Sequence, residues 1–162
     1  MPTSGVSLVE FKTGKTQWRC WDLSGQGRFR SLWAYYTGHV QAIIYVVDVT
    51  DVDRVACSRD EFAGVLDLQK VKEKRLPVLI FASKWDLRDG ESGDGGDPAA
   101  GGGGKKAKCL TLENITMGFG IEGLQEKHKV KVCSASGVNG TGVSEGFTWL
   151  NDVIASKGDG DE

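Results

Sequence analysis

Ala42-Ile43-Ile44-Tyr45-Val46-Val47-Asp48 is a continuous apolar run rich in β-branched residues, and Val78-Leu79-Ile80-Phe81-Ala82 is a second run of the same kind. Runs without polar alternation are typical of strands that are buried on both faces in a parallel sheet. Residues 53–70 between them carry apolar side chains at helical spacing: Val55, Phe62, Val65 and Leu66. Residues 42–82 therefore predict a strand–helix–strand unit and an α/β fold with helices on both faces of a sheet.

The neighbouring segments extend this unit. Residues 7–11 and 17–21 are short, partly alternating runs joined by a linker with Gly14 at its tip, which predicts an antiparallel hairpin. Residues 130–133 predict a further strand. Residues 143–155 predict a closing amphipathic helix, because apolar side chains recur there at spacings of three and four: Phe147, Leu150 and Ile154.

Two segments lack the composition of a packed core. Residues 89–108 hold eight of the chain's 23 glycines and almost no apolar side chains that could be buried, so we expect a disordered glycine-rich insert. Residues 156–162 are expected to form a flexible acidic tail. The predicted organisation is one domain over residues 1–155, interrupted by the insert.

Composition excludes several classes of protein. The net charge of -2, with basic and acidic residues interspersed, argues against binding to nucleic acid. The four cysteines show no C-x-x-C spacing, so we expect buried thiols and no disulfides. No apolar run reaches the roughly 18 residues of a spanning helix, which indicates a cytoplasmic protein with only indirect, peripheral membrane association. His39 and His128 have no partners at metal-ligand spacing and are expected on the surface or in turns.

The run Trp21-Asp22-Leu23-Ser24-Gly25-Gln26 follows a predicted strand and carries residue types that sense a phosphate. An aspartate at a strand end can hold magnesium, and a glycine N–H can meet a terminal phosphate. A glutamine can orient a water molecule. The alternative is an ordinary acidic turn.

Two further motifs follow later strands. Ser83-Lys84-Trp85-Asp86 comes directly after a buried strand, and the Asp86 carboxylate there can accept two hydrogen bonds from the N1 and N2 edge of guanine. Adenine offers no such donor pair, so the site would reject it strongly. Lys84 would lie over the base. Cys133-Ser134-Ala135 follows the last strand, where a backbone N–H could meet the guanine oxygen. Three such motifs in order predict a guanine-nucleotide site.

With these motifs the chain resembles the ADP-ribosylation-factor family of small GTPases from residue 2 to about residue 154. Pro2-Thr3 resembles its switch I, Ser24-Gly25-Gln26 its G-G-Q element and Ser83 to Asp86 its N/T-K-x-D element. Within the family, residues 24–33 and 41–44 look most like the branch that recruits the Bardet–Biedl coat to ciliary membranes. The resemblance implies the mixed sheet of a small GTPase, with helices on both faces, and a role in membrane, vesicle or ciliary trafficking.

The resemblance also implies roles for single residues. Thr3 and Asp22 would bind Mg²⁺, Gly25 would bond the γ-phosphate of GTP and Gln26 would position the attacking water. GTP and GDP would be read by Ser83, Lys84, Asp86, Cys133, Ser134 and Ala135. Trp33, Tyr35 and Tyr36 would belong to the effector-facing switch II region, with core packing as the alternative. The implied partners are effector or coat proteins, an exchange factor and a GTPase-activating protein.

The chain departs from the family in its phosphate loop. The pattern G-x-x-x-x-G-K-[ST] requires a strand before it and a helix after it, and it does not occur in the 162 residues. Thr13-Gly14-Lys15-Thr16 imitates its end, but Val9 stands at the first glycine. We therefore expect a fold without the first strand, phosphate loop and first helix, in which the sheet loses its middle. The expected explanation is an incomplete sequence, begun at an internal methionine or a mistaken start.

Lesser departures concern three serines. Ser83 stands where the family has Asn or Thr, Ser24 replaces the first glycine of G-G-Q, and Ser134 lies where alanine is usual.

Each lost phosphate-loop hydrogen bond would cost about 1.5–3 kcal/mol, so nucleotide affinity and hydrolysis should be weak. Three readings stay open: a guanine-nucleotide switch, a nucleotide-free interaction module that keeps the effector surface, and a fragment without function.

Overall fold

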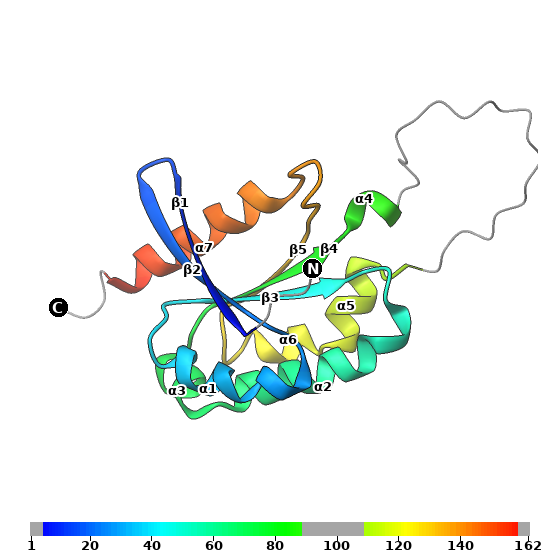
Figure 1. Cartoon of the computed structure of the whole chain (residues 1–162), viewed down its shortest axis with the longest axis horizontal. Coiled ribbons are helices and arrows are strands. Elements are labelled where there is room, and N and C mark those ends of the chain that lie inside the picture. The colour runs from blue at the N-terminus through cyan, green and yellow to red at the C-terminus, as the bar shows by residue number, and fades with distance from the viewer. Residues whose placement is uncertain (1–4, 89–108, 159–162) are drawn as a thin grey trace, which may run out of the picture.

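The computed structural model describes residues 5–88 and 109–158. Its elements, in chain order, are β1 (Val6–Thr13), β2 (Thr16–Leu23), the 3-10 helix η1 (Gly27–Phe29), α1 (Ser31–Thr37), β3 (Ile43–Asp48), the 3-10 helix η2 (Val52–Arg54), α2 (Val55–Asp67), α3 (Gln69–Lys74), β4 (Val78–Ser83), α4 (Trp85–Arg88), α5 (Leu112–Gly118), α6 (Ile121–Leu124), β5 (Val130–Ser134) and α7 (Val143–Gly158). The predicted α/β class is confirmed (Figure 1).

The strands form two separate sheets. β1 and β2 pair antiparallel from Val6 opposite Leu23 to Thr13 opposite Thr16, around a tight turn in which Gly14 has a φ of +57°. β3, β4 and β5 form a three-stranded parallel sheet in that order. The expectation was the mixed sheet of a small GTPase without its middle, and the sheet is indeed divided in two, since none of the described strands lies between β2 and β3.

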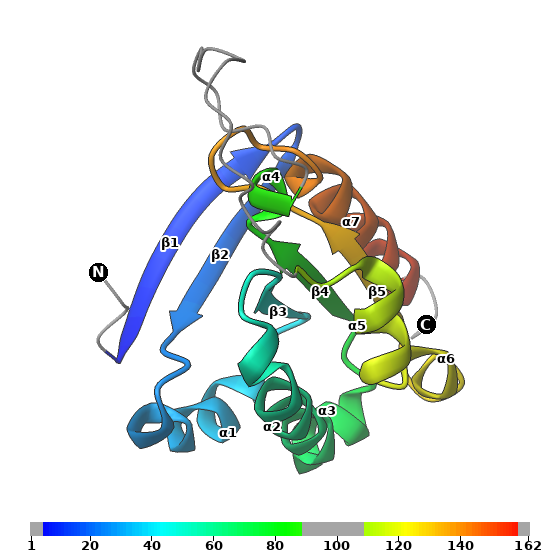
Figure 2. The same ribbon diagram turned by 90° about the vertical axis from the view of Figure 1, so that its right-hand side faces the viewer.

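Helices cover both faces of the parallel sheet (Figure 2). On one face, β3 and β4 pack against α2 and α5 in the larger core, where Phe62, Ile80 and Ile115 are at most 1% exposed. On the other face α7 packs on Leu79 and Phe81 through Leu150. Side chains of β4 are therefore buried on both sides, as the continuous apolar run predicted.

Two contact regions hold the hairpin to the rest of the chain. Near its turn, the rings of Phe11 and Trp18 each lie 5.1 Å from the ring of Phe147 on α7. At its other end, the ring of Trp21 lies 5.2 Å from the ring of Tyr36 on α1. The hairpin is thus anchored at both ends without a strand contact to β3.

Element ends differ from the predicted ones in two places. The predicted helix over residues 53–70 is two helices, because Leu68 takes an extended conformation with a ψ of 132° between α2 and α3. The closing helix runs past residue 155 to Gly158, so the first residues of the predicted tail are helical. Lys157 explains this extension, since its Nζ donates a hydrogen bond of 3.2 Å to the Lys74 carbonyl and also bonds the Arg75 carbonyl.

One residue that was expected on the surface or in a turn is buried, and two predicted segments lie at least partly outside the described residues. His128 lies in the turn after α6, as predicted, but it is only 8% exposed. The glycine-rich insert at residues 89–108 lies outside the described residues, as do residues 159–162 of the tail.

Candidate functional site

The first loop of the site follows β4. The strand ends at Ser83 and α4 begins at Trp85, so Lys84 joins strand and helix, and it does so in the left-handed region with a φ of 60°. The Ser83 hydroxyl donates a hydrogen bond of 3.1 Å to the Val47 carbonyl. This bond fixes the end of β4 to β3 at the point where the loop begins.

Asp48, the last residue of β3, anchors Lys84. Its Oδ2 lies 2.6 Å from Nζ of Lys84, and its Oδ1 accepts bonds from N and Oγ1 of Thr50 at 2.9 and 2.7 Å. Burial raises the pKa of Asp48, but the hydrogen bonds from Lys84 and Thr50 outweigh it, so that the net pKa lies below its usual value. The same contact raises the pKa of Lys84. An ion pair therefore holds the lysine of the first loop.

Asp48 is not among the site residues predicted from the sequence. The signal that could have found it is its position, since an acidic residue that closes a buried apolar run stands at the carboxyl end of a strand, where open α/β sheets bind ligands.

The second loop follows β5 and lies against the first. The Ala135 N–H donates to the Ala82 carbonyl at 2.8 Å, and the Trp85 N–H donates to the Ala135 carbonyl at 3.1 Å. Behind this loop, Gly142 approaches so closely that a Cβ there would lie 1.8 Å from the Ser134 carbonyl oxygen. The structure therefore brings the two predicted base-reading loops together.

Cys133 contributes its backbone alone to this region. Its side chain is 4% exposed and packs in the smaller core beside Phe81. Burial raises the pKa of its thiol, whose Sγ lies 3.9 Å from the Glu145 carboxylate. The side chain of Cys133 thus belongs to the packing under α7 and not to the loop.

Asp86 has a buried carboxylate oxygen that nothing in the described chain satisfies. Its Oδ1 is shielded from solvent, and no hydrogen-bond partner for this atom occurs among the described residues. A buried polar atom without a partner costs about 1–3 kcal/mol, and more when charged. Such an atom requires an explanation, and a ligand that donates hydrogen bonds to Asp86 supplies one.

The segment after β2 forms a compact turn. Ser24 is 3% exposed; its Oγ accepts the Gln26 N–H at 3.3 Å and its carbonyl accepts Trp33 Nε1 at 3.2 Å. Arg30 Nε donates to the Gly25 carbonyl at 3.1 Å. These bonds leave the backbone of Gly25 and the side chain of Gln26 at the surface.

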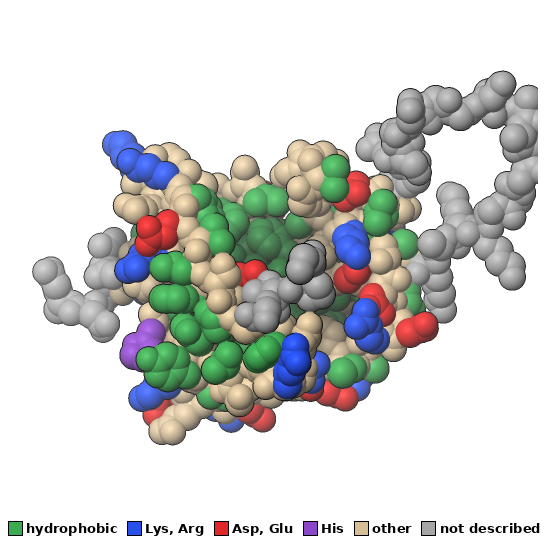
Figure 3. Space-filling model, viewed as in Figure 1, with side chains coloured by type: hydrophobic (Ala, Val, Ile, Leu, Met, Phe, Trp, Pro, Cys, Tyr) green, Lys and Arg blue, Asp and Glu red, His purple; other side chains and the backbone are tan. Residues whose placement is uncertain are grey.

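A cavity of about 1,320 Å³ lies between the hairpin and β3. Asp22, Gly25 and Gln26 line it, and so does Asp48. Figure 3 shows a hollow with hydrophobic side chains around it on this face. The base-reading loops do not line the cavity, but Asp48 contacts Lys84 and so connects the two groups of residues. Thr3 lies outside the described residues.

The aromatic residues of α1 lie at the surface more than in a core. Tyr35 is 67% exposed, and its ring lies 5.2 Å from the ring of Tyr36. Trp33 is half-buried. Tyr36 is also half-buried, and its ring contacts those of Tyr35 and Trp21, so Trp21, Tyr35 and Tyr36 form an aromatic patch that is exposed at Trp21 and Tyr35.

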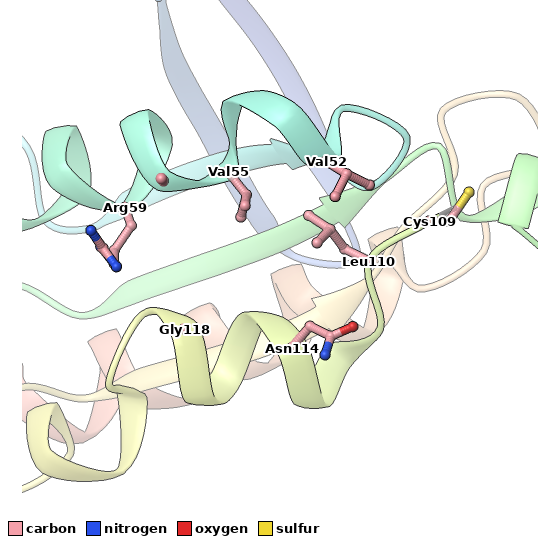
Figure 4. Close-up of a pocket in the computed structure, with 8 residues that line it drawn as sticks. Val52, Val55, Arg59, Cys109, Leu110, Asn114 and Gly118 are labelled. Atoms are coloured by element: carbon pink, nitrogen blue, oxygen red, sulfur yellow. The ribbon is translucent and has the colours of Figure 1, made fainter. Parts of the chain in front are cut away.

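A second cavity, of about 310 Å³, lies between α2 and α5 (Figure 4). Its polar side chains are already engaged: Asn114 forms a capping box with Thr111, and Arg59 bonds Asp60. It offers no convergent free polar groups and is not part of the site.

Three further features bear on the chemistry of the chain. All four cysteines are free thiols, but only Cys133 is buried as expected, because Cys57 is exposed and Cys20 and Cys109 are half-buried. Within residues 5–88 and 109–158, no group of three or more His, Cys, Asp or Glu side chains is placed to hold a metal ion. Across the same residues, no helix has the length and apolarity needed to cross a bilayer.

Comparisons with known proteins agree with this geometry. The model of the ADP-ribosylation factor family matches residues 1–154. ADP-ribosylation factor-like protein 6 from Danio rerio is 36% identical over 154 residues, which are 95% of this chain and 72% of that relative. A solved structure of the Arl6 BBS3 small GTPase from Trypanosoma brucei, with the nucleotide analogue GppNp bound, matches with a TM-score of 0.78 at 25% identity, over 96% of this chain and 83% of that one. The chain therefore belongs to the ADP-ribosylation factor family of small GTPases.

Proposed function

We propose that this chain binds guanine nucleotides as a regulatory switch of the ARF-like type. The observation that carries the proposal is the buried Oδ1 of Asp86, which has no partner among the described residues and lies in α4, whose first N–H, that of Trp85, donates to the Ala135 carbonyl after β5. Guanine would satisfy it, because the N1–H and N2–H₂ groups of the base are adjacent donors that match the two carboxylate oxygens.

The neighbouring groups would complete base recognition. The Lys84 side chain, held by Asp48, would cover one face of the base with its alkyl stem. The backbone N–H of Ser134 would meet the guanine oxygen, and Cys133 and Ala135 would position it, since the Ala135 N–H already donates to the Ala82 carbonyl at the end of β4. Ser83 would brace the loop through its bond to Val47.

The phosphates and a magnesium ion would lie on the cavity side. Mg²⁺ is commonly held by one or two carboxylates together with substrate phosphates, so Asp22 on the cavity wall fits as a ligand and Thr3 would add a hydroxyl. When bound, the ion would neutralise phosphate charge. Gly25 would offer its N–H to the γ-phosphate, and Gln26 would orient the attacking water.

Hydrolysis by this chain is proposed to be weak or lost. The 162 residues contain no G-x-x-x-x-G-K-[ST] sequence, whose backbone N–H groups and lysine would otherwise cradle the phosphates. Affinity would then come mainly from the base, which leaves the γ-phosphate poorly held for in-line attack.

Nucleotide binding is tested by titrating the purified chain with fluorescently labelled GDP in the presence of Mg²⁺. The proposal predicts saturable binding that excess unlabelled GDP or GTP abolishes and excess ADP does not. Equal competition by ADP, or no binding at millimolar nucleotide, would contradict it.

A second candidate is a nucleotide-free interaction module that retains the ARF-like effector surface. The aromatic patch of Trp21, Tyr35 and Tyr36 supports it, since Trp21 and Tyr35 expose rings that a partner could cover. This alternative predicts partner binding that neither GDP nor GTP changes, together with no binding of labelled GDP.

The cellular role is proposed from the relatives. Similarity to ADP-ribosylation factor-like protein 6 supports a role in membrane, vesicle or ciliary trafficking, with effector or coat proteins, an exchange factor and a GTPase-activating protein as partners. Such a role would place the chain in the cytoplasm and at the periphery of intracellular or ciliary membranes. Co-precipitation from cells would test this role, with the chain held either in its GTP-bound state or in its GDP-bound state. The measurement would show whether partners distinguish the two states.

A further inference from the structure

The fold itself does not require the glycine at position 25. Its φ lies outside the left-handed region, and a Cβ there would meet no atom of the described chain within 4 Å beyond its chain neighbours. Glycine loses more conformational entropy on folding than any other residue, so its presence calls for another explanation. Close approach of a ligand to the backbone is one, and Gly25 lines the cavity on whose side the phosphates are proposed to lie.

The two peptide groups that flank Gly25 are held at three of their four polar atoms. The Ser24 carbonyl accepts Trp33 Nε1–H at 3.2 Å. The Gly25 carbonyl accepts Arg30 Nε–H at 3.1 Å, and the Gln26 N–H donates to the Ser24 hydroxyl at 3.3 Å. The fourth atom, the Gly25 nitrogen, has no hydrogen-bond partner within residues 5–88 and 109–158. The turn thus presents one unpaired backbone donor in a fixed setting.

Arg30 connects this turn to helix α2. Its Nη1 forms an ion pair with Oε1 of Glu61 while its Nε bonds the Gly25 carbonyl. The side chains of Arg30 and Glu61 are 32% and 33% exposed, so water and salt screen the pair less than they screen a fully exposed one. Because the guanidinium is planar and rigid, the bond to Glu61 also fixes the direction in which Nε points. The position of α2 therefore determines how the Gly25 peptide is held.

We propose that Ser24 and Arg30 are positioning residues that hold the Gly25 N–H ready for the γ-phosphate, with Glu61 on α2 as the anchor of Arg30. The inference rests on the proposed guanine-nucleotide function and names the residues behind its γ-phosphate contact. A donor that is fixed before the ligand arrives avoids the entropy cost of ordering a glycine on binding. These three residues, the turn clamp, should therefore favour nucleotides that carry a γ-phosphate over those that lack one.

Removing the anchor separates the turn clamp from a simple effect of charge. Arg30 lines the cavity, so attraction between its charge and the phosphates is the alternative. Glu61→Ala removes a negative charge, which by attraction alone would strengthen the binding of an anionic nucleotide. The turn clamp predicts the opposite sign: affinity for GppNp, a GTP analogue with a γ-phosphate, should fall by about fivefold or more. Affinity for GDP should change by less than about twofold.

Two further variants sharpen this comparison. Asp60→Ala removes the same charge from the neighbouring residue of α2, whose side chain is 69% exposed and pairs with Arg59, so it should change neither affinity. Alanine is a good helix former, so both α2 variants should fold. Arg30→Lys keeps the charge but has a single side-chain nitrogen in place of the rigid fork, so it should lose GppNp affinity as Glu61→Ala does.

Hydrogen–deuterium exchange of the full chain without nucleotide measures the turn clamp directly. Glu61→Ala should speed amide exchange in residues 24–30, and Asp60→Ala should leave it unchanged. Ser24→Ala removes the acceptor of the Gln26 N–H and should also speed exchange there. It should weaken GppNp binding more than GDP binding, because it loosens the peptide beside Gly25.

Three outcomes would overturn the inference. They are unchanged exchange of residues 24–30 in Glu61→Ala, a GppNp affinity that rises in Glu61→Ala, and equal losses of GppNp and GDP affinity. If the parent chain binds neither nucleotide, the γ-phosphate role fails together with the proposed function. The exchange measurement, which contains no nucleotide, distinguishes that failure from failure of the turn clamp alone.

Discussion

Replacing Asp86 with Asn should exchange the base that the chain prefers while leaving the fold intact. The substitution keeps the shape of the side chain but turns one acceptor into a donor. Guanine would then lose one charge-assisted hydrogen bond, worth about 1.5–3 kcal/mol, and would face an unpaired donor costing about 1–3 kcal/mol. The sum of about 2.5–6 kcal/mol predicts a fall in GDP affinity of about two to four decades.

The same reasoning predicts a gain for a different base. Xanthine carries a carbonyl where guanine has its 2-amino group, so the amide of the variant would again match both positions. Xanthosine diphosphate should therefore bind the Asp86→Asn chain more tightly than GDP does. Because the parent carries a buried oxygen without a partner in the described chain, the variant should unfold in urea at no lower concentration than the parent.

Competition against labelled GDP, with guanosine and xanthosine diphosphates as competitors, measures both effects. Asp152→Asn, on the exposed face of α7, is the matched control and should change neither affinity nor preference. The reasoning is refuted when Asp86→Asn weakens both nucleotides equally, or when its effect does not exceed that of Asp152→Asn.

Three further predictions concern the scaffold of the site. Gly142→Ala would place a Cβ 1.8 Å from the Ser134 carbonyl oxygen, at a backbone φ of +71°. The free energy of unfolding, measured in urea, should therefore fall by about 2–4 kcal/mol. An unchanged free energy of unfolding would rule out this close approach. Gly146→Ala would place a Cβ 2.5 Å from ring carbons of Phe81. Although alanine has the better helix propensity, thermal unfolding should show a loss of about 1–3 kcal/mol of stability. A gain in stability would show that the Phe81 ring moves freely. Burial lowers the pKa of His128 below its usual value of 6.5, so the unfolded chain takes up a proton that the folded chain does not. Stability that is present above pH 6.5 should therefore fall as the pH drops through and below that value. Urea unfolding across this pH range measures how the stability depends on pH, and His128→Gln should reduce that dependence. An equal pH dependence of stability in the variant would exclude His128 as its source.

Local patterns were sufficient to predict most elements. The two apolar runs became β3 and β4, and the glycine between two alternating runs became the turn of the β1–β2 hairpin. The helical spacing of Phe147 and Leu150 predicted α7. Each of these signals depends on residues close in sequence, which is why it could be read without the structure.

Features that depend on distant contacts were missed or misplaced. The break at Leu68 lies between two helices with continuous apolar patterns, and nothing local marks its extended ψ. The extension of α7 depends on Lys157 reaching carbonyls after α3, more than 80 residues earlier in the chain. Burial of His128 likewise comes from tertiary packing, which composition does not reveal.

The candidate site likewise has some features that the sequence predicted and others that only the structure revealed. The residues proposed to read the base were predicted because each follows a strand whose end is visible in the sequence, and a bond between Trp85 and Ala135 joins their two segments in the structure. The link between Asp48 and Lys84 could not be predicted, since it requires the register between β3 and β4. A sheet without its middle was expected from the missing phosphate-loop pattern, but the cavity between the hairpin and β3 became visible only with the packing of α2 and α7.

The central claim is that the loops after β4 and β5 recognise guanine. Hydrogen–deuterium exchange with and without nucleotide tests it most directly, because it reports where a ligand binds as well as whether it binds. The account predicts that GDP with Mg²⁺ slows exchange in residues 83–88 and 133–136, and that ADP at the same concentration does not. Equal protection by GDP and ADP, or protection by GDP that spares both segments, would contradict it.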